Sequence, residues 1–178
     1  MINTILFLII SSLSFMKSEV IYDFKINASL DHWYIVNDGV MGGLSQSILN
    51  VTEEGHGQFS GTVSLENYGG FASVRFDTRS IEVSGHTHIR LKVKGDGKRY
   101  QFRIKDKRRS YHSYINYFET TGEWETIDIP IASLYPSFRG RTLDMPNFHH
   151  DYIEELSILI GNKKAESFKI LIDEISLK

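Results

Sequence analysis

The sequence predicts an all-β fold, an antiparallel β-sandwich or jelly roll. Apolar side chains recur at every second position in several runs after Tyr22, which is the period of a strand with one buried face. Each run spans about five to seven residues, the usual length of a strand. The runs are bounded by Gly, Asn or Asp, which favour turns. Many short strands separated by turns are typical of two packed antiparallel sheets.

The alternating runs give the individual elements in chain order. We expect strands at residues 59–65, 89–94, 100–105, 124–129 and 168–172. The segment Gly95-Asp96-Gly97 lies between two of these runs, which predicts a hairpin turn. Residues 151–156 have a mixed pattern and predict one short helix or turn. No linker or repeat divides the chain, so we expect a single domain from residue 19 to residue 178.

The amino-acid composition indicates a folded domain and excludes any functional site that depends on cysteine. The chain has 178 residues, 41% of them hydrophobic and 12% aromatic, which is typical of a folded domain. It contains no cysteine, which excludes disulfides, thiolate metal sites and cysteine nucleophiles.

The first eighteen residues differ from the rest. An apolar run over residues 5–10 extends to Met16 and ends at Lys17, which predicts a signal peptide or an apolar anchor. We therefore expect an exported protein that is periplasmic, extracellular or tethered to a membrane through its N-terminus. The alternative is an apolar extension of a cytoplasmic protein. No Arg precedes Lys17, whereas a mitochondrial transit peptide is Arg-rich, so a matrix location is not expected.

A glycine-rich loop follows Trp33. Glycine occupies three of the five positions from Gly39 to Gly43, which indicates positive φ or close approach of the backbone. We expect Trp33, Gly42 and Gly43 to set the shape of the loop. The side chains that either brace the loop or contact a partner are Asn37, Asp38, Met41 and Ser45.

Several motifs recur in a fixed order along residues 22–177. The turn Asp38-Gly39-Val40-Met41-Gly42-Gly43-Leu44-Ser45 is followed by Gly69-Gly70-Phe71-Ala72-Ser73-Val74-Arg75. Weaker pieces follow at residues 95–97, 124–130, 138–141 and 168–175. This order resembles the complex I intermediate-associated protein 30 family. The resemblance implies a galactose-binding-like β-sandwich and a binding or assembly module without a catalytic centre. Its partner would be a respiratory-complex subunit or an assembly intermediate.

Charge is concentrated in one window. Residues 90–109 hold ten of the twenty basic residues and two acidic ones, a net charge of +8. One interpretation is an electropositive face, with Lys92, Lys94 and Arg103 as candidates, that attracts an acidic protein, an anionic glycan or a lipid headgroup. The other is that these are ordinary solvated strand faces. Arg75, which ends the second glycine-rich motif, is a further candidate binding residue. The net charge of −2 and the absence of a nucleic-acid motif argue against nucleic acid.

Aromatic residues indicate a second class of ligand that the domain could bind. Six rings lie in or beside the basic window: Tyr100, Tyr111, Tyr114, Tyr117, Phe118 and Trp124. We expect most of them in the core and one or two exposed. Exposed rings on a sandwich stack against sugars, so a glycan remains an alternative to a protein partner.

Signals for catalysis and metal binding are weak. His86 and His88 share a strand face, and His149-His150-Asp151 groups donors locally, but neither set has further ligands at a recognisable spacing. We expect no metal, no cofactor and no enzyme activity. Two functions therefore stay open: protein-partner binding, and glycan binding at the cell envelope.

Overall fold

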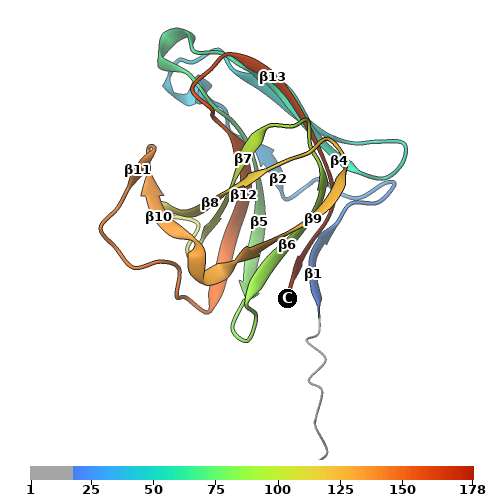
Figure 1. Ribbon diagram of the computed structural model, residues 1–178, viewed down its shortest axis with the longest axis vertical. Coiled ribbons are helices and arrows are strands. Elements are labelled where there is room, and N and C mark those ends of the chain that lie inside the picture. The colour runs from blue at the N-terminus through green and yellow to red at the C-terminus, as the bar shows by residue number, and fades with distance from the viewer. Residues whose placement is uncertain (1–17) are drawn as a thin grey trace, which may run out of the picture.

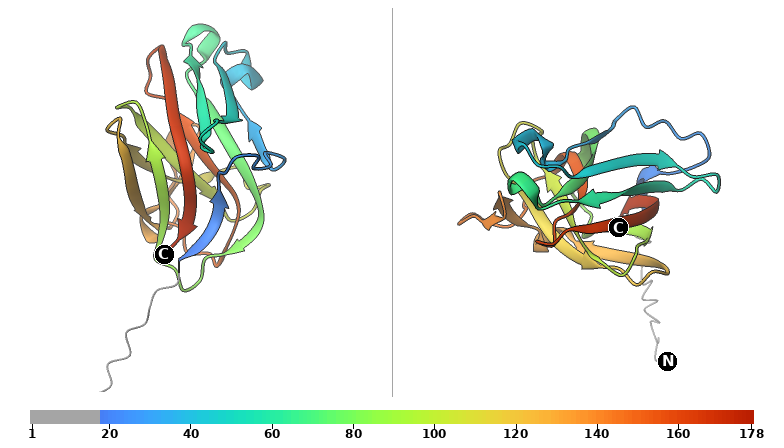
Figure 2. Two further views of the ribbon diagram at one scale, coloured as in Figure 1. Left: turned by 90° about the vertical axis from the view of Figure 1, so that its right-hand side faces the viewer. Right: turned by 90° about the horizontal axis from the view of Figure 1, so that it is seen from above.

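The computed structural model describes residues 18–178, and shows two antiparallel β-sheets packed face to face (Figure 1). The predicted all-β sandwich is therefore confirmed. Figure 2 shows the two layers from the side and from above. The predicted signal peptide lies outside the described residues, as do the side chains of Val40 and Met41. In the described part of the chain, no helix has the length and apolar character needed to cross a membrane.

Sheet A has six strands. Its order is β3-β4-β13-β6-β9, and β1 also pairs with β13. The strands are β1 (Glu19–Asp23), β3 (Gln46–Val51), β4 (Gly57–Val63), β6 (His88–Lys94), β9 (Trp124–Pro130) and β13 (Glu166–Leu177).

Sheet B has seven strands in the order β11-β10-β8-β7-β12-β5-β2. The strands are β2 (Trp33–Ile35), β5 (Ala72–Glu82), β7 (Arg99–Lys105), β8 (Ser113–Glu119), β10 (Tyr135–Phe138), β11 (Arg141–Thr142) and β12 (Tyr152–Ile160). Three single-turn 3-10 helices join strands: η1 (Asp38–Met41), η2 (Glu66–Tyr68) and η3 (Ile131–Ser133).

The core fills the space between the sheets, and the period-two pattern explains which side chains enter it. On β6 of sheet A, Ile89, Leu91 and Val93 are fully buried. On β7 of sheet B, Phe102 and Ile104 are buried in the same cluster. Burying one such side chain stabilises the fold by roughly 1.5–3 kcal/mol. A shift of one residue would expose all the apolar side chains of a strand, so the alternation specifies which face is internal.

The predicted hairpin at Gly95-Asp96-Gly97 is wrong. This segment carries the chain from β6 in sheet A to β7 in sheet B, so the two strands do not pair. Asp96 stabilises the crossing, because its carboxylate accepts hydrogen bonds from Tyr100 Oη at 2.8 Å and from the backbone N of Lys169 at 3.0 Å. Alternation identifies a strand but not its partner, and a short glycine turn fits both connections.

The predicted short helix or turn at residues 151–156 is also wrong. This segment opens β12, which pairs with both β5 and β7. Both faces of the strand are covered, since Leu156 packs in the core while Glu155 is buried against Tyr34 on the other face. A central strand buried on both faces loses the simple alternation of apolar and polar residues.

Candidate functional site

Asp38 joins the two glycine-rich motifs. It is 1% exposed, and its Oδ1 accepts a hydrogen bond from the backbone N of Ser45 at 3.0 Å. Its Oδ2 accepts hydrogen bonds from the Ser45 hydroxyl, from Gly70 N at 2.6 Å and from Phe71 N at 3.2 Å. The η1 loop and the segment that leads into β5 are therefore held together by one carboxylate.

The surroundings of Asp38 explain two of the glycines. A Cβ on Gly43 would collide with the Asp38 carboxylate, and one on Gly69 would lie 2.7 Å from Oδ2. Burial alone would raise the pKa of Asp38, but the hydrogen bonds from Ser45, Gly70 and Phe71 outweigh it and lower that pKa. The ionised form is thus the one that the fold stabilises.

The other loop candidates have mostly internal contacts. Trp33 is 8% exposed and packs against Tyr22, Phe24 and Phe76, with ring centroids about 5 Å apart. Asn37 Oδ1 accepts a hydrogen bond from the Ser47 hydroxyl at 2.7 Å. Gly42 is exposed and has a φ of +91°, as the sequence predicts. The side chain of Met41 lies outside the described set, so whether it braces the loop or contacts a partner stays a prediction.

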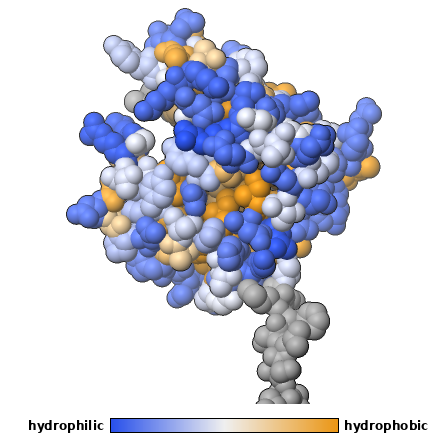
Figure 3. Space-filling view, in the orientation of Figure 1, coloured by the Kyte–Doolittle hydropathy of each residue, from blue (hydrophilic) through white to orange (hydrophobic). Residues whose placement is uncertain are grey.

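A cleft of about 340 Å³ opens on the face of sheet B that points away from the core. It is lined by Gly70, Phe71, Arg75, Gln101, Arg103, Lys105, Tyr111, Ser113, Ser137, Phe138, Arg139, Gly140, Leu159 and Gly161. Figure 3 shows the hollow at the left of the molecule, between the projecting β10–β11 tip and the loops above it. The surface around it is largely hydrophilic.

Strand register arranges the floor of the cleft in rows. One continuous row of cross-strand neighbours runs from β2 to β10: Tyr34, Arg75, Ser157, Arg103, Ile115 and Tyr135. Of the sequence-predicted site residues, this row brings together Arg75 and Arg103. They belong to strands that are not adjacent, and only Ser157 lies between them.

Hydrogen bonds fix the charged side chains of the floor. Arg75 Nη1 lies 3.4 Å from Glu155 Oε1, and Tyr34 Oη donates to Glu155 Oε2 at 2.5 Å. Arg103 donates through Nε and Nη2 to Gln101 Oε1, at 3.0 and 2.5 Å. Lys105 Nζ donates to the Ser110 carbonyl at 2.8 Å. The floor is thus pre-organised.

Burial and mutual repulsion act on these cations. Burial, and then the positive charge of Arg75, lower the pKa of Arg103 to about 10. Burial also lowers the pKa of Lys105. The charge of Glu155 opposes this effect, while the charges of Arg75 and Arg103 add to it. Burial and the hydrogen bond to Glu155 raise the pKa of Tyr34 to about 12.

Two exposed rings stand at the rim. Tyr111 is 63% exposed and Phe138 is 37% exposed, and they meet edge to face with centroids 5.3 Å apart. The Arg139 guanidinium lies over the Phe138 ring at 5.2 Å. Nearby, the guanidinium of Arg99 on β7 covers the ring of Tyr117 on β8, 4.5 Å from the ring centroid. One face of the Phe138 ring and one face of the Tyr117 ring are therefore each occupied by a cation.

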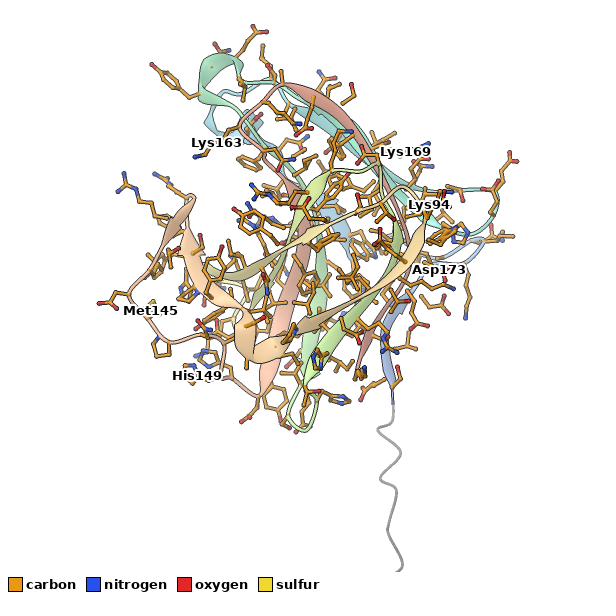
Figure 4. The ribbon with its side chains drawn as sticks, in the orientation of Figure 1. Lys94, Met145, His149, Lys163, Lys169 and Asp173 are labelled. Atoms are coloured by element: carbon orange, nitrogen blue, oxygen red, sulfur yellow. The ribbon has the colours of Figure 1, made fainter. Side chains whose placement is uncertain are left out.

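The basic window does not form one face. Lys92 and Lys94 lie on β6 of sheet A, whereas Arg103 lies on β7 of sheet B. Lys92 pairs with Asp173 at 2.7 Å, and Figure 4 shows Lys94 and Asp173 on the side of the molecule away from Lys163, which stands above the mouth of the cleft. The window is divided because the connection at residues 95–97 changes sheets.

The exposure of the aromatic rings agrees only in part with the expectation. Tyr100, Tyr114 and Phe118 are buried, but Tyr111, Tyr117 and Trp124 are exposed, which is three rings rather than one or two. Within residues 18–178, no group of three or more His, Asp or Glu side chains is placed to hold a metal ion.

Several lining residues were not identified from the sequence. Gln101 and Lys105 alternate with core residues on β7, which was enough to place them on the outer face with Arg103. Ser113 and Ser137 are paired across β8 and β10, and they gave no signal because short polar side chains occur throughout the chain.

Solved structures share this fold. A family 11 carbohydrate-binding module from Clostridium thermocellum, in complex with a β-1,3-1,4-mixed-linked tetrasaccharide, matches with a TM-score of 0.68 and 19% identity, covering 90% of this chain and 94% of that one. An agarase matches with a TM-score of 0.64 and 11% identity, covering 90% of this chain and 24% of that one. The fold is thus a galactose-binding-like sandwich.

Two curated relatives have similar sequences. Complex I intermediate-associated protein 30, mitochondrial, of Mus musculus is 22% identical, over 90% of this chain and 56% of its own length. The protein of the same name from Drosophila melanogaster is 26% identical, over 72% of this chain and 51% of its own length. This chain spans about half the length of these relatives. A model of the family matches residues 22–172, and the chain belongs to the complex I intermediate-associated protein 30 family.

Proposed function

We propose that this chain is a non-catalytic binding module that holds a protein partner in the cleft on sheet B. The partner would be a respiratory-complex subunit or an assembly intermediate, as the name of the family implies. The observation that carries the proposal is the cleft itself, whose charged floor is fixed by internal hydrogen bonds before any ligand arrives. Pre-organised side chains lose little entropy on binding, which favours affinity.

The lining of the cleft supports a binding role over a catalytic one. The described lining residues include no carboxylate and no histidine, the side chains that most often act as general acid or base. Glu155 lies beneath the floor, but Tyr34 and Arg75 hold its two oxygens. It braces the cations and is not presented to a ligand.

The opposite face of the sandwich is less suited to binding. On sheet A, Lys92 pairs with Asp173, and Arg90 pairs with Asp128 at 2.7 Å. These charges are compensated within the chain. On sheet B, Arg75 is paired with Glu155, but in the described part of the chain Arg103 bonds only to the neutral Gln101 amide.

The state of the aromatic rings favours a protein partner over a neutral glycan. A sugar ring stacks on a free aromatic face, but Arg139 covers one face of Phe138, and Arg99 covers one face of Tyr117. Tyr111 and Phe138 meet at an interplanar angle of 80°, so they do not form a common flat platform.

Carbohydrate binding is the second candidate, and Tyr111 is the observation that favours it. This ring is 63% exposed at the rim of a cleft, in a fold shared with a module solved with a bound tetrasaccharide. Stacking of one pyranose ring on Tyr111 would be sufficient for weak binding.

Affinity purification from the protein's own host tests the first candidate. We expect the wild-type chain to retain a partner that Arg103→Gln loses, while Lys92→Gln, on the opposite sheet, retains it. The identified partner is then purified and titrated against all three proteins. Equal binding by Arg103→Gln and wild type would remove the cleft from the proposal.

Calorimetric titration with a β-1,3-1,4-mixed-linked tetrasaccharide tests the second candidate. Binding by wild type that Tyr111→Ala abolishes would replace the protein partner with a glycan. If no heat of binding is detected at millimolar sugar, the hypothesis of carbohydrate binding is refuted.

A further inference from the structure

We propose that the cleft binds carboxylate groups on an acidic, extended segment of the partner protein, with Arg75, Arg103 and Lys105 as the groups that contact them. This inference rests on the proposed function, and it adds the chemistry of the ligand.

The lining is cationic, and Glu155 beneath the floor, paired with Arg75, offsets only part of its charge. Four of its side chains carry positive charge, Arg75, Arg103, Lys105 and Arg139, and none of the described lining residues is acidic. Lys163 adds a further cation above the mouth (Figure 4). The whole chain has a net charge of −2, so the cleft differs in sign from the molecule that carries it. A recessed site of one sign concentrates the field and attracts the opposite charge.

Arg103 is the most informative of these residues. In the described part of the chain its guanidinium donates to the neutral Gln101 amide and has no carboxylate partner. The charge that acts most strongly on its pKa is Arg75, which is also positive. Removing a charge from water without pairing it costs free energy, and an incoming carboxylate would recover that cost.

Arg75 has spare donor capacity as well. Its Nη1 is 3.4 Å from Glu155, a long contact, and its buried Nε has no hydrogen-bond partner in the described structure. A guanidinium presents five donors in a planar fork that matches a carboxylate. Glu155 therefore orients Arg75 and leaves donors available for a ligand.

The spacing of the cations indicates more than one carboxylate. Arg75 and Arg103 are separated by Ser157 in the cross-strand row, so their Cα atoms lie two strand spacings, about 9–10 Å, apart. Lys105 lies two residues beyond Arg103, about 7 Å along the strand. At these Cα spacings the three cations leave room for more than one carboxylate. An extended chain places alternate side chains about 7 Å apart, which fits this array.

The floor also determines the mode of recognition. It is the face of a sheet whose central strands β7 and β12 are hydrogen-bonded on both sides, so a partner cannot add a strand there. Recognition must come from side chains. The occupied faces of Phe138 and Tyr117 favour an acidic peptide over an acidic glycan, which would use those rings for stacking.

Fluorescence anisotropy tests the inference with defined probes. A labelled peptide of alternating Glu and Ser is titrated with the full chain, beside the same peptide with Gln in place of Glu. We expect at least about tenfold tighter binding of the Glu peptide, and weaker binding as salt rises, because exposed charges are screened. Equal affinity for the two peptides would overturn the proposal.

Three substitutions locate the site. Arg103→Gln should reduce affinity for the Glu peptide by about tenfold, the size of a charge-assisted hydrogen bond, and Arg103→Lys should retain part of it. Lys92→Gln, which removes a charge from the opposite sheet, should leave the affinity unchanged. Thermal melts of all three variants confirm that each is folded. A similar loss with Lys92→Gln would show a non-specific charge effect and refute the site.

The outcomes also separate this inference from the proposed function. If the Glu peptide fails but the purified partner still depends on Arg103, the cleft binds a protein without reading carboxylates. If both fail, the cleft is not the binding surface. An oligogalacturonate that binds more tightly than the peptide would assign the cations to an acidic glycan instead.

Discussion

Replacing Asp38 tests whether the two glycine-rich motifs form one hydrogen-bonded unit. In Asp38→Ala the backbone N atoms of Ser45, Gly70 and Phe71 lose their acceptor together. An unsatisfied buried donor costs about 1–3 kcal/mol. Gly70 and Phe71 are only partly buried, so water compensates some of the loss. We therefore expect a decrease of about 3 kcal/mol in the free energy of unfolding.

Asp38→Asn is the finer change. The remaining carbonyl oxygen can still accept from Gly70 and Phe71, but the new amide then faces the Ser45 backbone N, donor against donor. We expect a loss of about 1–2 kcal/mol, since one buried donor is left without an acceptor. Urea denaturation at pH 7 measures both values. Asp144→Asn is the control, because Asp144 is an exposed carboxylate whose loss should change stability by less than about 0.5 kcal/mol.

The pH dependence gives an independent check. The pKa of Asp38 is lowered in the folded state, so its contribution to stability is present above its ordinary value of 3.8 and is lost as pH falls through the folded pKa. The difference between wild type and Asp38→Asn should therefore shrink below about pH 4. If Asp38→Ala unfolds within about 1 kcal/mol of wild type at pH 7, the carboxylate does not hold the motifs together.

Three further changes test other parts of the molecule. Gly42→Val should lower the free energy of unfolding by about 1–3 kcal/mol. An added Cβ meets no other atom, so the loss would come from the positive φ, and Gly42→Asn should lose less. Equal urea midpoints for the two variants would contradict backbone strain. Trp33→Ala should lower the free energy of unfolding by about 3–5 kcal/mol through the cavity that it leaves, and a loss below about 1 kcal/mol would contradict its burial. Processing should leave a mature chain that begins between Ser14 and Ile21, as shown by intact mass in cell fractions. A full-length mass in the cytosol would contradict export.

The sequence was sufficient to predict the two-layer fold and part of the candidate site. Period-two alternation on β6 and β7 correctly separated core from surface, because burial of one face dictates that pattern. The clustered glycines indicated close approach, and at Gly43 the structure shows the Asp38 carboxylate where a Cβ would be.

The sequence could not show which strands pair. Arg75 and Arg103 were singled out for separate reasons, and their proximity depends on β12, which lies between their strands and whose first residues, up to Leu156, were expected to form a helix or turn. Lys92 and Arg103 were grouped because they are close in sequence, although they lie on opposite sheets. Long-range register is a property of the whole fold, and local periodicity does not contain it.

The position of β13 has a consequence for the order in which the protein can fold. This strand, residues 166–177, hydrogen-bonds to β1, β4 and β6, so sheet A has no centre until the ribosome has made it. Until then β4 and β6 each present an unpaired edge, which invites pairing with other chains. Sheet A therefore cannot be completed until the last strand of the chain has been synthesised. A nascent chain stalled before residue 166 is expected to depend on chaperones to stay soluble.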